Sequence, residues 1–168
     1  MAIVKRADRQ HYMNIGSAAN PVWYQIGEGF TEFAESKNAV SYQRRYIHEV
    51  TKRTDVTGYA PVIDYEFEVY TANPVIDRLR RIADEELVGE DAKVDVMTVD
   101  LFDEGAIPGC YHAYRRQYSV IPDESGKGTD ALVYTGTMKG VGDVAAGAFV
   151  PASGIWTADT AGAPTANV

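Results

Sequence analysis

The sequence contains a single cysteine, Cys110, and no run of apolar residues long enough to cross a membrane. One cysteine cannot form a disulfide within the chain or build a cysteine-based metal site, so we expect a reducing compartment. A membrane helix needs roughly 18 consecutive apolar residues, and the residues that follow Met1 lack the apolar stretch of a secretory signal. We therefore expect a soluble protein that does not use a signal peptide.

Positive charge is also scarce, because 16 Lys and Arg residues face 24 Asp and Glu residues and give a net charge of −8. The acidic residues concentrate in the middle, where residues 54–104 hold 14 Asp/Glu and 4 Lys/Arg. Affinity for nucleic acid comes largely from Lys and Arg that release counterions from phosphates. This composition disfavours a protein that grips DNA, whereas a surface along which DNA slides remains compatible with it.

The chain is long enough for one compact domain. Of its 168 residues, 45% are hydrophobic, including 11 Tyr. A chain of this size can bury most of its apolar surface in a single core. We expect one domain over residues 1–156, with an irregular N-terminal arm at 1–21, and a flexible tail of small and polar residues at 157–168.

Alternation of apolar and polar residues predicts a mainly β protein. In residues 63–69, apolar side chains alternate with Asp64, Glu66 and Glu68, which is the two-residue period of a half-buried strand. Residues 94–102 carry apolar side chains on both faces, which indicates a bulge or two covered faces. Other segments with strand composition are 22–26, 41–47, 111–121 and 131–141.

One α-helix is expected at about residues 74–88. Asn73 is a favourable N-cap, Pro74 suits the first helical position, and Gly89 suits the position after the last turn. By contrast, residues 49–61 are polar and turn-rich and show no apolar period, so we expect a long loop there. Long loops in compact domains are commonly functional.

No combination of residues predicts catalysis, a cofactor or a metal. Asp64, Glu66 and Glu68 share one strand face and one environment, whereas paired catalytic carboxylates need separated pKa values. His11, His48 and His112 are scattered without metal-ligand spacing. We therefore expect a non-enzymatic protein without cofactor.

The order of several features resembles the tail tube, or major tail, proteins of tailed bacteriophages. These features are a Trp-bearing strand ending in Gly-x-Gly at 22–29, a polar loop ending in Val56-Thr57-Gly58-Tyr59-Ala60-Pro61, an acidic alternating strand, Asn73-Pro74 before a single helix, and a β-rich half ending in Gly154-Ile155-Trp156. The resemblance covers roughly residues 10–156.

The resemblance implies a β-sandwich or rolled β-barrel flanked by one helix, with hexameric rings that stack into the tail tube of a virion assembled in the host cytoplasm. It implies as partners other copies of the chain, a tape measure protein and tail-end proteins, with DNA passing through and no membrane involved. Within that frame we expect Asp64, Glu66 and Glu68 to face the lumen, where negative charge repels phosphate. The expected contact with an adjacent ring is the loop with its flanking residues: Arg44, Arg45, Lys52, Arg53, Asp55 and Tyr59.

A different class of function is also open from the sequence. A small monomeric β-sandwich could bind a ligand such as a carbohydrate through Trp23, Tyr24 or Tyr59. It would differ from a tube subunit by remaining monomeric at high concentration.

Overall fold

A computed structural model describes residues 1–159 of the chain. It is mainly β, with one α-helix, and so confirms the predicted fold class. The elements are η1 (Arg6–Asp8), β1 (Arg9–Asn14), β2 (Trp23–Ile26), β3 (Phe30–Ser36), β4 (Ala39–Arg44), β5 (Arg53–Tyr59), β6 (Val62–Glu68), α1 (Pro74–Asp84), η2 (Gly89–Ala92), β7 (Lys93–Glu104), β8 (Tyr111–Lys127), β9 (Val133–Val150) and β10 (Ile155–Ala158).

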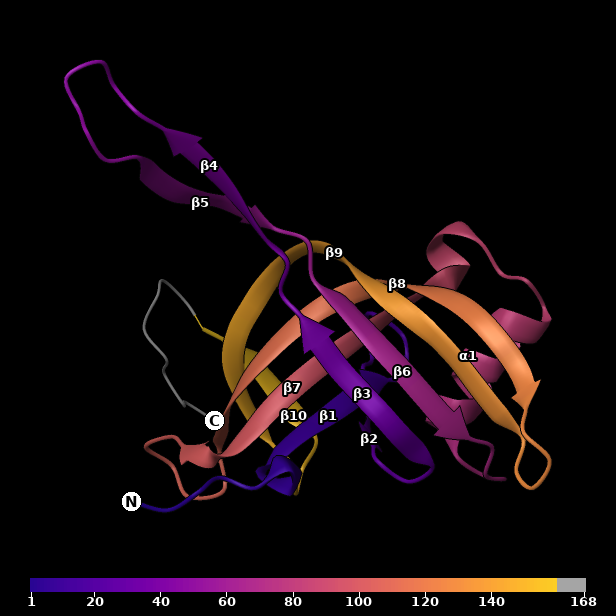
Figure 1. The fold of residues 1–168 in the computed structure, drawn as a ribbon. Helices are drawn as coiled ribbons and strands as arrows, with labels where there is room; N and C mark the ends of the chain where they lie inside the picture. Colours follow the sequence, from indigo (N-terminus) through magenta and orange to yellow (C-terminus); the bar gives the residue numbers. More distant parts are fainter. Residues whose placement is uncertain (160–168) are drawn as a thin grey trace.

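Eight strands form one curled sheet with the shape of a half-barrel (Figure 1). The strand order is β2-β1-β7-β8-β9-β6-β3, and β10 pairs with part of β9. All the pairs are antiparallel, and β7, β8 and β9, which overlap the predicted strand segments 94–102, 111–121 and 131–141, form a meander. The edge strands β2 and β3 lie at opposite ends of this order, so the barrel is not closed by hydrogen bonds between them.

Helix α1 fills one end of the inner face of the sheet. Ile63, Tyr65 and Phe67 of β6 point toward it and are at most 3% exposed, so the predicted alternation on this strand is confirmed. The helix contributes four buried apolar residues to this core: Val75, Ile76, Leu79 and Ile82. Burying each such side chain stabilises the fold by about 1.5–3 kcal/mol, which ties the helix to the inner face.

The helix begins as predicted but ends earlier. The Asn73 side chain accepts hydrogen bonds from the amides of Val75 and Ile76, at 3.1 and 3.3 Å, and Pro74 takes the first position. The last helical residue is Asp84, and Glu86 has a left-handed backbone with φ of 52°. The chain therefore turns before Gly89, and the predicted end at residue 88 is wrong by one turn.

A second core lies on the opposite face of the sheet. Met97 and Val99 of β7 pack there with Tyr12, Ala113 and Phe149, whereas Val94 and Val96 of the same strand belong to the core under the helix. The apolar residues on both sides of β7 thus reflect two covered faces, one of the two explanations that the sequence left open.

Two predicted irregular segments are strands instead. Residues 9–14, within the expected arm, form β1 in the middle of the sheet, paired with both β2 and β7. Residues 53–59, within the expected loop, form β5, which pairs with β4. At the other end, residues 157 and 158 of the expected tail belong to β10, and residues 160–168 lie outside the described part.

Candidate functional site

The most distinctive feature of the molecule is a two-stranded ribbon that stands away from the half-barrel (Figure 1). It comprises residues 39–59, and we call it the projecting hairpin. It continues the antiparallel pair of β3 and β6, because Asn38 and Ala60 are joined by a backbone hydrogen bond of 3.2 Å just before β4 begins. No residue of the projecting hairpin is buried in the described chain.

This arrangement explains why the sequence predicts a loop at 49–61. Apolar alternation marks a strand only where one of its faces packs on a core, and both faces of the projecting hairpin are exposed. Thr54, Val56 and Thr57 carry the β propensity that the polar composition around them hides. An isolated two-stranded hairpin is marginally stable in water, so a surface of another molecule would stabilise it.

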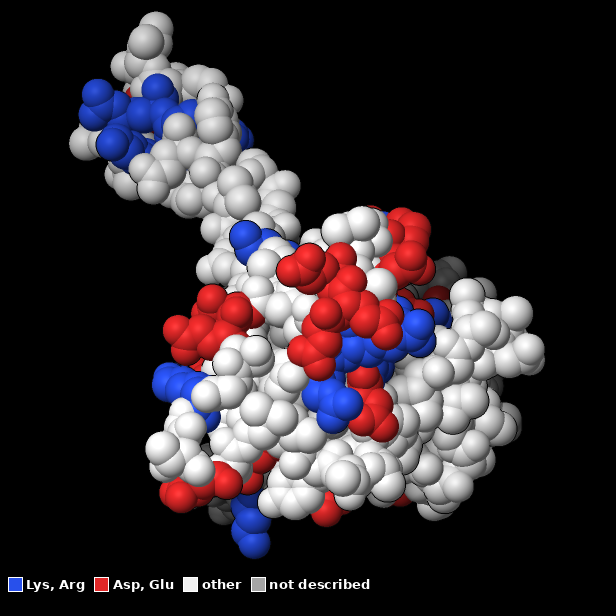
Figure 2. Space-filling model, turned by 90° about the vertical axis from the view of Figure 1, so that its right-hand side faces the viewer, with Lys and Arg blue, Asp and Glu red and all other residues white. Residues whose placement is uncertain are grey.

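The six residues expected to contact a neighbouring copy all lie on this hairpin. Arg44 forms an ion pair with Asp55 across the ribbon, and Arg53 forms one with Glu49. Both acidic residues of the hairpin are therefore engaged, whereas Arg45 and Lys52 have no ion pair among the described residues. With four Lys/Arg and two Asp/Glu, the hairpin is positive on a chain of net charge −8. Figure 2 shows this basic tip set apart from a body that carries more acidic side chains.

Aromatic rings and arginines stack along one side of the hairpin. The Arg44 guanidinium lies 5.7 Å from the ring centroid of Tyr42 and 6.0 Å from that of Tyr46. The Arg53 guanidinium lies 5.8 Å from the same Tyr46 ring. These cation–π contacts hold the side chains in place without burying them, so the ribbon presents an ordered surface.

Large apolar side chains are concentrated on the same hairpin. Its exposed members are Val40, Tyr42, Tyr46, Ile47, Val50, Val56 and Tyr59. Ile47 and Val50, at the tip, are essentially fully exposed, at 108% and 94%. Contiguous exposed apolar surface of this kind marks an interaction site.

The predicted carboxylate row lies on the face of β6 that points away from the helix. Asp64 is exposed and Glu66 and Glu68 are half-buried, while their neighbours on the strand form the core. Glu32 of β3 stands opposite Glu66 in the pairing register, which adds a fourth carboxylate to this face. Thr31 donates a hydrogen bond of 3.0 Å to Glu66. The row is thus a polar outer surface of the half-barrel.

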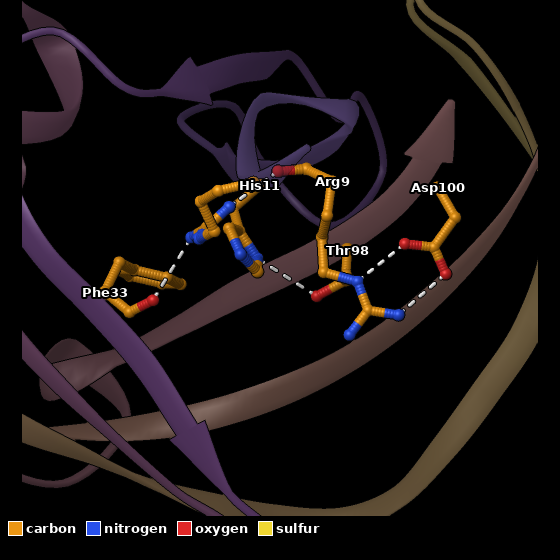
Figure 3. Close-up of polar contacts among 6 residues, drawn as sticks. Arg9, His11, Phe33, Thr98 and Asp100 are labelled. Carbon is orange, nitrogen blue, oxygen red and sulfur yellow. Dashed lines mark hydrogen bonds and ion pairs between the residues drawn. The ribbon is translucent and has the colours of Figure 1, made fainter. Parts of the chain in front are cut away.

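A polar cluster that the sequence did not reveal lies between β1, β3 and β7 (Figure 3). The Arg9 guanidinium donates two hydrogen bonds to the buried Asp100 carboxylate, at 2.6 and 2.9 Å. His11 lies 3.1 Å from the Thr98 hydroxyl, and its ring packs on Phe33 with 4.7 Å between centroids. Arg9, His11 and Met13 alternate along β1 and lie on its inward face. Two of the three are polar, so the sequence did not indicate a buried face.

Burial determines the ionisation of His11. The imidazole is 6% exposed, and desolvation, helped by the nearby cations Arg6 and Arg9, lowers its pKa from 6.5 to about 4. His11 is therefore neutral near pH 7, which is consistent with a structural role in the core. Arg6 completes the cluster by donating to the Arg9 carbonyl at 2.7 Å and to the Phe33 carbonyl at 3.3 Å.

The other candidate reactive residues stay apart. Cys110 is fully buried, and desolvation raises the pKa of its thiol. His48 lies at the hairpin tip and His112 on β8, and no group of three metal-ligating side chains occurs in residues 1–159. Within the same range, no helix has the length and apolar character needed to cross a membrane.

The aromatic residues of a possible ligand-binding surface do not form one platform. Trp23 is half-buried against the second core and lies 5.3 Å from the Arg115 guanidinium. Tyr24 is exposed on β2, whereas Tyr59 lies at the base of the projecting hairpin. The three side chains therefore belong to separate surfaces.

Comparison with known proteins identifies a fold relative. No model of a known protein family matches the chain, and no curated protein matches its sequence. The fold is similar to that of a chain in a solved structure described as "Cryo-EM structure of the anti-feeding prophage (AFP) baseplate, 6-fold symmetrised". The TM-score is 0.50 with 16% sequence identity, and the alignment covers 87% of this chain and 95% of that chain.

Proposed function

We propose that the protein is a structural subunit of a phage tail or of a related injection particle, and more specifically a tail tube protein. In this proposal, copies close into hexameric rings, and the rings stack into a tube through which DNA passes. The fold shared with a chain of a six-fold prophage baseplate supports the broader statement. The order of sequence features in residues 10–156 supports the more specific one.

The observation that carries the proposal is the projecting hairpin. It exposes seven large apolar side chains on a ribbon without a core of its own. It is also positively charged while the rest of the chain is strongly negative. A ring or stack is built by contacts between different surfaces of identical copies, and a basic apolar hairpin facing an acidic body suits such contacts.

Asp64, Glu66 and Glu68 are the lumen residues of this proposal. They form an acidic row on the strand face opposite the helix, and such a row lining a channel would repel phosphate, so that DNA slides without binding. The proposal assigns no catalysis and no cofactor. Its partners are other copies of the chain, a tape measure protein and the proteins at the tail ends, all within the virion.

The test is the state of the purified protein over a range of concentration. Size-exclusion chromatography with light scattering, followed by negative-stain electron microscopy, should show rings with a central channel and, at high concentration, stacked tubes. In such tubes, a large thiol reagent should not reach Asp64→Cys, while it should label Glu85→Cys, an exposed position at the C-terminal end of the helix. A protein that stays monomeric under all conditions, or full labelling of position 64 in intact tubes, would contradict the respective part of the proposal.

A further inference from the structure

The two free edges of the half-barrel border a groove. β2 and β3 are consecutive in the chain and are joined by a tight turn in which the Phe30 amide donates to the Gly27 carbonyl at 3.1 Å. They nevertheless do not pair with each other, and they form the two ends of the sheet order. The groove between them has a volume of about 690 Å³, and β1 and η1 complete its wall.

Both sides of this groove offer strand edges without a backbone partner in the described chain. β3 pairs with β6 on one side only, and β2 pairs with β1 on one side only. At the β3 edge, the Phe33 carbonyl accepts only a side-chain bond, from Arg6. Free strand edges readily accept another extended segment, and addition of a strand is a common way in which sheets recognise peptides.

The floor of the groove is apolar, and its rim carries charges of both signs. Ile26 is buried, and Phe30 and Phe33 are partly buried, so the floor would accept apolar side chains. Glu32 lines the groove from β3, and Arg6 and Arg9 line it from η1 and β1. An apolar extended segment would therefore complement the floor of this groove.

The segment Met1–Lys5 has these properties. Met1, Ile3 and Val4 are 130%, 95% and 49% exposed, and the backbone of residues 1–4 forms no hydrogen bond with the described residues. The segment leads away from the body (Figure 1) and has an extended backbone at Lys5. Because residues 1–4 are all apolar, either alternation places apolar side chains toward the floor.

We propose that the groove between β2 and β3 binds residues 1–5 of a second copy as an added strand. The added strand joins the two edges of the half-barrel, and it links adjacent copies by backbone hydrogen bonds. This inference rests on the proposed self-assembly, but it concerns a different surface from the projecting hairpin.

Disulfide trapping tests the strand exchange in the full chain. Ile3→Cys is combined with Thr31→Cys or, to sample a second register, with Ala34→Cys. All three positions are exposed, and native Cys110 is fully buried. Disulfides form only when the Cα atoms come within about 7 Å. The matched control combines Ile3→Cys with Glu124→Cys, an exposed position on β8 remote from the groove.

Under mild oxidation, at least one groove pair should give a ladder of covalent multimers on non-reducing gels. The yield should exceed that of the control pair by roughly ten-fold or more, because docking raises the effective concentration of the two thiols. Excess peptide of residues 1–8 should reduce the ladder, and a scrambled peptide should not. Circular dichroism confirms that the variants are folded.

Two outcomes overturn the inference. One is a yield no higher than the control, and the other is a disulfide found only within single chains, which would mean that the segment occupies its own groove. Electron microscopy of the same samples separates this result from the proposed function. Rings without trapping would reject the strand exchange alone, whereas trapped multimers without rings would support the exchange and contradict the tube.

Discussion

Removal of the projecting hairpin should separate folding from assembly. Ser36 pairs with Val62 at the end of the β3–β6 ladder, and hairpin loops of four residues are common. Pro61 lacks the N–H that would close a two-residue turn, so the loop should include it. The variant therefore replaces residues 39–60 with one glycine and leaves the loop Lys37-Asn38-Gly-Pro61 between Ser36 and Val62. Asn38 already has a left-handed backbone, with φ of 46°.

The body should fold as before. The deletion removes no buried side chain, and a shorter connection favours folding by about 0.6 kcal/mol for each halving of its length. This gain opposes the loss of the ribbon's own hydrogen bonds, so we expect the free energy of unfolding to change by about 1 kcal/mol or less. For a chain of this size that corresponds to an unfolding temperature within about 4 °C of the native value.

Assembly should be lost over the accessible range of concentration. Full burial of one large apolar side chain is worth about 1.5–3 kcal/mol, and the hairpin exposes seven. Even if contacts between copies bury only two of them, the loss is at least about 3 kcal/mol, or a more than 100-fold higher concentration for assembly. The milder variant Ile47→Ser/Val50→Ser, which keeps the ribbon, should show a smaller shift in the same direction.

Sedimentation velocity over a dilution series measures the concentration at which assemblies form, and thermal circular dichroism measures folding. Thr54→Ser, a conservative change on an exposed position of the same ribbon, serves as the control and should match the native chain. A deletion variant that is folded and assembles at the native concentration would refute the assignment of the hairpin to contacts between copies.

Three further predictions concern the stability of the fold. The pKa of folded His11 lies below its unfolded value, so the free energy of unfolding is highest above about pH 6.5 and falls by about 3 kcal/mol as the pH drops toward 4. Urea unfolding at several pH values should show this loss reduced in His11→Gln. The same dependence of stability on pH in the variant and the native chain would contradict the prediction. Arg9→Met leaves the buried Asp100 carboxylate without its partner. It should lower the free energy of unfolding by about 3 kcal/mol, measured by denaturant unfolding. A decrease below about 1 kcal/mol would indicate that water replaces the guanidinium. Gly136→Ala places a methyl group 2.4 Å from the Tyr65 hydroxyl and should lower the free energy of unfolding by about 1–3 kcal/mol. Gly58→Ala is the control, because the space around Gly58 is open. It should change the free energy of unfolding by less than about 0.5 kcal/mol.

Local sequence was sufficient where one face of an element packs on a core. The alternation in residues 63–69 identified β6 because Ile63, Tyr65 and Phe67 face the helix while the carboxylates face outward. Asn73-Pro74 located the start of the helix because a cap acts through neighbouring amides. Strand composition at 94–102, 111–121 and 131–141 located parts of β7, β8 and β9.

Local sequence failed where pairing alone stabilises a strand or where polar side chains face inward. β5 has no buried face, so its residues show no apolar period and indicated a loop. β1 points Arg9 and His11 into the half-barrel, where Asp100 and Thr98 satisfy them, so its pattern did not indicate burial. The first error comes from the lack of a buried face on a local hairpin, and the second comes from partners distant in the chain, which no local window contains.

The sequence by itself determined a β-rich domain with one capped helix, an acidic middle and no recognisable catalytic or metal-binding pattern. Tertiary structure alone decided that residues 39–59 project as an ordered basic ribbon, and that the free edges of β2 and β3 border the same groove. The physical reason is that composition and periodicity report how each residue meets its local surroundings. The positions of free strand edges depend on how the whole sheet curls, which pairings between distant residues control.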